Sequence, residues 1–149
     1  MALLALLEIA ALLAAPVQPR SGPCGMLTAT DMMPLLGAEP QPTDEPCLWK
    51  SKEGFNRVVI MLSSFRGSRA SAMYNDTRKS VGADPDANVT DELGFGDRAL
   101  SAMTPFGVVV VMMKGDQLVQ MQYWVGGKPD KAAAVSLLRP LAARVLAAL

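Results

Sequence analysis

The stretch FGVVVVMMKGDQLVQMQYWV, residues 106–125, contains two strand-like segments separated by a short polar turn. The first segment, residues 106–114, is so continuously apolar that it predicts a strand in the middle of a sheet. In the second segment apolar and polar residues alternate, which is the pattern of a strand with one buried face. Its apolar members are Val119, Met121, Tyr123 and Val125, and its polar members are Gln120 and Gln122. The stretch therefore predicts a β-hairpin with one buried and one partly solvated face.

Segments on both sides of this hairpin predict further strands and helices. The strands are expected at residues 47–52, 55–64 and 98–103, and the helices at residues 28–36, 68–80 and 129–149. The last helix carries one apolar stripe, so we expect it to pack across the sheet. The predicted fold is α+β: a single antiparallel sheet covered on one face by a short N-terminal helix and a long C-terminal helix. Thr28 and Asp31 have the spacing of a capping box at the start of the first helix.

The N-terminal residues predict an exported protein. Residues 1–15, MALLALLEIAALLAA, are apolar apart from Glu8, and they are fewer than the roughly 20 residues that a membrane-spanning helix needs. This length is typical of a signal peptide, and an N-terminal helix of the mature protein is the alternative. Residues 16–23 are predicted to be a flexible linker, and residues 24–149 a single α+β domain. We expect a periplasmic or secreted protein without a stable membrane span in the mature chain.

The composition excludes several classes of function. The chain of 149 residues has no histidine, so a Ser-His-Asp or Cys-His catalytic arrangement is impossible within it. Its 14 basic and 14 acidic residues balance, which does not favour nucleic acid as a partner. We expect no catalytic residues, no cofactor and no metal site, and the partner is expected to be a protein or a small molecule.

Cys24 and Cys47 are the only cysteines, and three roles compete for them. Pro23 directly before Cys24 disfavours a lipid anchor, and redox catalysis would prefer a Cys-x-x-Cys motif. Two thiols without histidine are too few ligands for a zinc site. In an exported chain, one pair of cysteines most simply forms one disulfide, which we expect between Cys24 and Cys47.

Several short motifs occur in a fixed order along the chain. These are Cys24, Leu27-Thr28, Leu36-Gly37, the CLW segment from Cys47 to Trp49, and GFGDRAL at residues 94–100. With the final hairpin and the C-terminal helix, this order resembles a family of small bacterial envelope domains of unknown function, many of them lipoproteins. The resemblance implies an exported α+β domain with a Cys24–Cys47 bridge and implies no activity. Lipoprotein members have a separate lipidated cysteine, and this chain has no third cysteine.

Two regions are candidates for function. Trp124 is expected on the same face of its strand as Gln120 and Gln122, where an exposed aromatic side chain can anchor a partner. The acidic segment of residues 84–97 contains Asp84, Asp86, Asp91, Glu92 and Asp97. We expect a non-enzymatic binding module of the cell envelope that uses Trp124, Gln120 and Gln122. The alternatives are a carboxylate-dependent hydrolase that uses the 84–97 segment, or an inhibitor of an extracellular enzyme.

Overall fold

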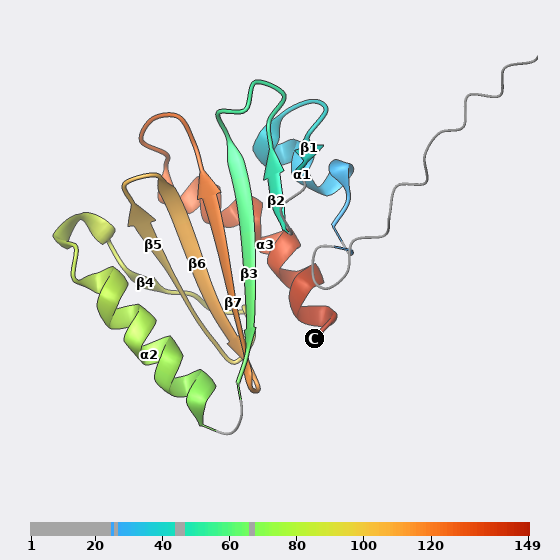
Figure 1. The fold of residues 1–149 in the computed structure, drawn as a ribbon. Coiled ribbons are helices and arrows are strands. Elements are labelled where there is room, and N and C mark those ends of the chain that lie inside the picture. Colours follow the sequence, from blue (N-terminus) through green and yellow to red (C-terminus); the bar gives the residue numbers. More distant parts are fainter. Residues whose placement is uncertain (1–24, 26, 44–46, 66–67) are drawn as a thin grey trace, which may run out of the picture.

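One seven-stranded antiparallel sheet runs through the molecule, with helices on both of its faces (Figure 1). The structure is a computed structural model, and it describes residues 25, 27–43, 47–65 and 68–149. In chain order the elements are α1 (Ala29–Leu36), β1 (Gln41–Pro42), β2 (Leu48–Lys50), β3 (Arg57–Ser64), α2 (Arg69–Gly82), the short 3-10 helix η2 (Pro85–Ala87), β4 (Thr90–Asp91), β5 (Arg98–Thr104), β6 (Gly107–Lys114), β7 (Gln117–Trp124) and α3 (Lys131–Ala147).

The predicted hairpin of residues 106–125 is confirmed, and it forms the middle of the sheet. The strand order is β1-β2-β3-β7-β6-β5-β4, so β7 is central and β6 lies beside it. Their register runs from Gly107 opposite Trp124 to Lys114 opposite Gln117. Gly115 in the turn has a φ of 58°, the left-handed conformation that glycine adopts without a steric penalty. The β3 strand pairs along the whole length of β7, which places residues 57–64 next to the hairpin.

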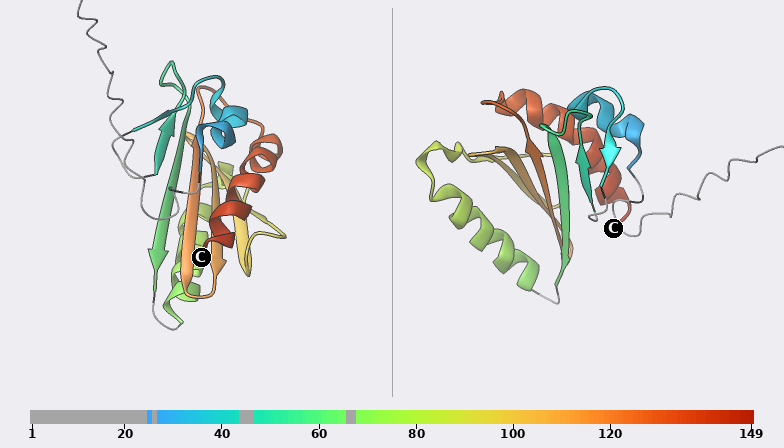
Figure 2. Two further views of the ribbon diagram at one scale, coloured as in Figure 1. Left: turned by 90° about the vertical axis from the view of Figure 1, so that its right-hand side faces the viewer. Right: turned by 45° about the horizontal axis from the view of Figure 1, so that its top comes forward.

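Helices α1 and α3 cover one face of the sheet, as the sequence predicts (Figure 2). The apolar residues of the alternating pattern in β7 point to this face and are buried with the apolar stripe of α3. Tyr123 at the end of β7 is also buried, and its hydroxyl donates a hydrogen bond to the carbonyl oxygen of Leu35, 2.8 Å away. Burial raises the pKa of the Tyr123 hydroxyl. The α+β class with a single antiparallel sheet is therefore confirmed.

The helix predicted at residues 68–80 is confirmed as α2, and it packs on the opposite face of the sheet. Tyr74 of α2 is fully buried among side chains of β5, β6 and the start of β7. The guanidinium of Arg98 lies over the Tyr74 ring, 4.3 Å from its centroid. The predicted covering of one face by α1 and α3 thus stands, and α2 adds a partial cover to the second face, to which the sequence assigns no helix. The reason is that α2 is mostly polar and buries only Ala70 and Tyr74. The order of apolar and polar residues in this helix therefore does not show which face of the sheet it packs on.

The start of α1 confirms the predicted capping box. The Thr28 hydroxyl accepts a hydrogen bond from the backbone N–H of Asp31, and the Asp31 carboxylate accepts one from the backbone N–H of Thr28. Arg144 of α3 pairs with the same carboxylate at 3.1 Å. Burial acts to raise the pKa of Asp31, but the Thr28 hydrogen bonds and the Arg144 charge outweigh it, so this pKa is lowered. The cap thereby also joins α1 to α3.

Several predictions concern residues outside the described ones. The predicted signal peptide, the linker and Cys24 all lie there, so the leader and the Cys24–Cys47 bridge stay predictions. Cys47 is described, and it lies buried just before β2 with a φ of 65°. In the part of the chain that the structure describes, no helix is both long and apolar enough to cross a bilayer.

Candidate functional site

Part of the sheet face that carries α2 is left without a helix above it. Strand alternation directs Val58 and Ile60 into the core beneath α1 and α3, so their neighbours in β3 point to the α2 face. Helix α2 lies over the β5–β6 side of this face, and β2 and β3 lie beyond it (Figures 1 and 2). We call the remaining part the open half-face. Its members are Leu48, Lys50, Arg57, Val59, Met61, Gln120, Gln122 and Trp124.

The register arranges these side chains in three rows across β2, β3 and β7. Lys50, Arg57 and Trp124 are opposite one another in the first row, at the end of the sheet next to the β5–β6 turn. The second row is Leu48, Val59 and Gln122, and the third is Met61 and Gln120. Met61 is 42% exposed, whereas the other apolar members are half-buried. The rows form a strip that is cationic and aromatic at one end and aliphatic beyond it.

An aromatic pair stands at the end of the open half-face. The rings of Phe106 and Trp124 are stacked with their centroids 5.2 Å apart and their planes 24° apart. Phe106 is 61% exposed although it is a large apolar side chain. The indole N–H of Trp124 donates a hydrogen bond to the Gln122 side-chain oxygen at 2.9 Å, which fixes the orientation of the ring. The pair therefore presents an ordered aromatic surface to solvent.

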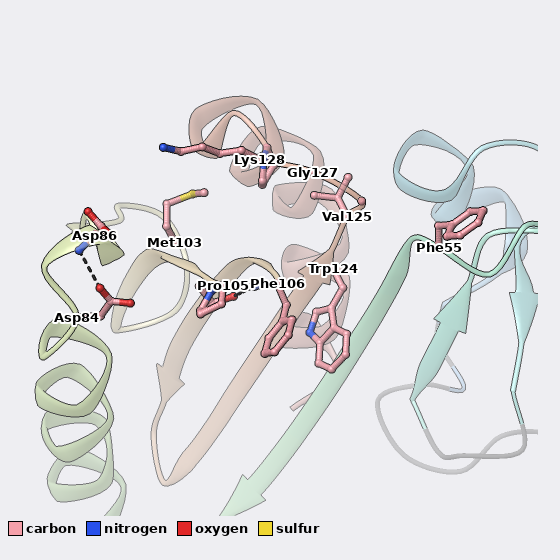
Figure 3. Close-up of a pocket in the computed structure, with 13 residues that line it drawn as sticks. Phe55, Asp84, Asp86, Met103, Pro105, Phe106, Trp124, Val125, Gly127 and Lys128 are labelled. Atoms are coloured by element: carbon pink, nitrogen blue, oxygen red, sulfur yellow. Dashed lines mark hydrogen bonds between the residues drawn. The ribbon is translucent and has the colours of Figure 1, made fainter.

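Behind the aromatic pair is a groove at the rim of the sheet, with a volume of about 840 Å³. We call it the rim groove. Figure 3 shows that Asp84 and Asp86 come from the η2 segment, Lys128 from the loop before α3, and Phe55 from the β2–β3 turn. Asp84 accepts a hydrogen bond from the backbone N–H of Asp86 at 2.9 Å. Among the described residues, none forms an ion pair with Asp84, Asp86 or Lys128, so these charges face solvent and the groove.

The three residues predicted to bind a partner all lie on the open half-face. Gln120, Gln122 and Trp124 are half-buried there, and the structure joins two of them by a hydrogen bond. The sequence does not single out Phe106, because its position in a turn does not show which side chain it will stack on. Lys50 and Arg57 are also missed, since they reach this surface only through the pairing of β2 and β3 with β7.

The carboxylates of the 84–97 segment do not converge on one place. Asp91 pairs with Arg78 of α2, and the hydrogen bond from this guanidinium holds the pKa of Asp91 below its usual value. Asp97 accepts a hydrogen bond from the Gly115 N–H at 2.7 Å, at the β6–β7 turn. That turn lies at the opposite end of the sheet from the β5–β6 turn (Figure 1), whose residues line the rim groove. Only Asp84 and Asp86 remain together at the groove.

The remaining acid, Glu92, belongs to a polar cluster under α3. The Ser101 hydroxyl donates to Glu92 at 2.5 Å, and the Arg139 guanidinium lies 3.6 Å from the other carboxylate oxygen. Lys131 donates to the Thr90 hydroxyl nearby, and burial lowers the pKa of Lys131 although the Glu92 charge opposes this shift. Ser101 is fully buried, so its hydroxyl cannot meet a substrate. The cluster fastens β4 to β5 and α3.

The GFGD motif at residues 94–97 is a structural turn. Gly94 and Gly96 have φ values of 80° and 67°, and the motif leads into strand β5 rather than into a helix. A phosphate-binding loop requires the N-terminus of a helix at that point, and here a strand follows the motif. Phe95 between the two glycines is inserted into the core beneath α3. Among the described residues, no group of three or more acidic or cysteine side chains could hold a metal ion.

Comparison with known protein families, with curated proteins and with solved structures finds no match to this chain. The resemblance to small bacterial envelope domains therefore stays a prediction, and function has to be argued from the open half-face and the rim groove.

Proposed function

We propose that this chain is an exported bacterial protein that acts as a non-enzymatic binding module of the cell envelope. Its binding surface is the open half-face together with the rim groove. The observation that carries the proposal is the stacked pair of Phe106 and Trp124, which stands where the two surfaces meet. Ordered aromatic side chains at the centre of a surface contribute a large share of binding energy in known interfaces.

Two further observations support binding over catalysis. The acidic residues of the 84–97 segment are separated, and Asp91, Glu92 and Asp97 are engaged in contacts within the fold. The open half-face places apolar or aromatic side chains in each of its three rows, and apolar side chains that lie together at the surface of a small protein mark interaction surfaces. An inhibitor of an extracellular enzyme would use the same surface, and its partner would be an enzyme that loses activity on stoichiometric addition of this protein.

Site-specific photo-crosslinking tests the binding surface. A photoreactive amino acid in place of Phe106 is expected to form a discrete crosslinked product in host cells, because a partner covering the aromatic pair must lie within its reach. The matched control carries the same amino acid in place of Leu93, which is 87% exposed and lines neither surface. The measurement is the yield of crosslinked product in each cell fraction. Equal or absent products at the two positions would refute the binding surface.

The export part of the proposal has a separate test. The intact mass of the protein recovered from its host is expected to lack the leader of residues 1–15 and to rise by two hydrogen masses on reduction. The first change reports cleavage of the signal peptide, and the second reports the Cys24–Cys47 disulfide. A mass that retains the leader, with two thiols that react without reductant, would contradict both expectations.

A further inference from the structure

The charges on the open half-face have one sign. Strands β2, β3 and β7 contain no aspartate or glutamate, whereas Lys50 and Arg57 lie side by side in the first row. Arg57 is exposed, and its Nε atom makes only a long contact of 3.5 Å with the Gly54 carbonyl oxygen. Among the described residues, none forms an ion pair with Lys50 or Arg57. The acidic residues of the rim groove, Asp84 and Asp86, lie on its η2 side, away from β2 and β3 (Figure 3).

Beyond the row that contains Trp124, the apolar side chains of the open half-face are aliphatic. Leu48, Val59 and Met61 continue from the Trp124 row along β2 and β3. Sugar rings stack on flat aromatic surfaces, whereas branched and thioether side chains pack against other aliphatic side chains. Methionine is also common on surfaces that adapt to different protein side chains. These rows therefore suit the side chains of a polypeptide.

We propose that the open half-face binds an acidic polypeptide segment that carries apolar side chains. The inference rests on the proposed binding function and names the chemistry of the partner. Apolar side chains of the segment pack on Val59, Met61 and the Phe106–Trp124 pair, and its carboxylates lie against Lys50 and Arg57. The acidic side of the rim groove repels carboxylates, so the negative end of the segment is directed towards β2. Charge complementarity of this kind sets both the orientation and the choice of partner.

The experiment uses the purified full chain and short synthetic peptides of matched apolar content. One peptide carries aspartate and glutamate between its apolar residues, a second carries asparagine and glutamine, and a third carries lysine. Binding is measured by fluorescence anisotropy of a label on each peptide, at low and at high salt. The acidic peptide is expected to bind most tightly and to weaken as salt rises, because exposed charge pairs are screened.

Charge variants locate the interaction. The double variant Lys50→Gln with Arg57→Gln is expected to bind the acidic peptide about tenfold more weakly, because two exposed charge contacts are lost. The matched control, Arg69→Gln with Lys79→Gln, removes the same charges from exposed positions on α2 and should leave the affinity unchanged. Circular dichroism of both variants verifies that the fold is retained.

Several outcomes would overturn the inference. One is equal binding of the three peptides, another is preference for the lysine peptide, and a third is no binding of any of them. Binding of polygalacturonate, an anionic polysaccharide, in place of the acidic peptide would also refute it, since the partner would then not be a polypeptide. These failures leave the binding function standing if the Phe106 position still forms a crosslink. The binding function itself fails only when that crosslink is absent or no stronger than the one at Leu93.

Discussion

Replacing Gly107 by alanine is expected to destabilise the fold severely. An added Cβ atom at this position would lie 1.9 Å from the carbonyl oxygen of Tyr123, far inside van der Waals contact. The clash is with the backbone of β7, the central strand, so no side-chain rotation can relieve it. The φ of 151° adds strain for any residue with a Cβ atom. Together the overpacking and the strain should cost about 4 kcal/mol or more, a large fraction of the stability of a small domain.

Urea denaturation followed by far-UV circular dichroism measures this cost. The matched control is Gly115→Ala at the other end of β6, where φ is also positive but no atom lies within 4 Å of the added Cβ. That variant should lose only about 1 to 2 kcal/mol, the penalty of a left-handed conformation. If the two variants were equally stable, the close approach of Gly107 to Tyr123 would be wrong. Gly107 also directly follows Phe106, so the aromatic pair of the binding surface depends on this approach.

Replacing Phe95 by alanine is expected to cost about 3 to 5 kcal/mol, the usual range for truncating a buried phenylalanine. Phe95 is fully buried, and the Arg139 guanidinium covers its ring at 4.2 Å from the centroid. The Arg139 Nη1 atom also donates a hydrogen bond to the Leu93 carbonyl oxygen at 2.8 Å, which closes the turn over the ring. The buried Phe95 side chain therefore anchors the GFGD turn, which forms the loop before β5, in the hydrophobic core.

Leu93→Ala serves as the control for the Phe95 variant. Leu93 lies two residues away in the same loop, and its exposed side chain should contribute less than about 0.5 kcal/mol. Both variants are compared with the unmodified protein by the midpoint of urea unfolding. A loss below about 1 kcal/mol for Phe95→Ala would show that the motif does not hold the core together.

Patterns of apolar and polar residues within single segments predict most of the helices and strands, because the spacing of apolar residues shows which side chains of that segment are buried. The continuous apolar run of residues 106–114 and the alternation after it identify the central hairpin. The Thr28 and Asp31 pair identifies the start of α1, since a capping box needs only four consecutive residues. The two-residue strands β1 and β4 escape prediction, because strands this short have no period to detect.

The candidate site is predictable only in part. Gln120, Gln122 and Trp124 are adjacent on one strand, so alternation alone places them on one face. Lys50, Arg57 and Phe106 join them through pairings between segments far apart in the chain. The acidic residues show the opposite case. The sequence groups them in one segment, whereas the fold engages Asp91, Glu92 and Asp97 with three different neighbours, away from the rest of the segment.

The sequence therefore determines the α+β class, the central hairpin and the capped first helix. The reason is that helix caps and the spacing of buried side chains depend on residues that are close together in the chain. The tertiary structure decides the strand order, the packing of α2 on the second face and the row of Lys50, Arg57 and Trp124. The physical reason is that these features depend on contacts between segments that are distant in the chain. Such contacts form only when the complete hydrophobic core assembles, so they cannot be predicted from the residue pattern of one segment.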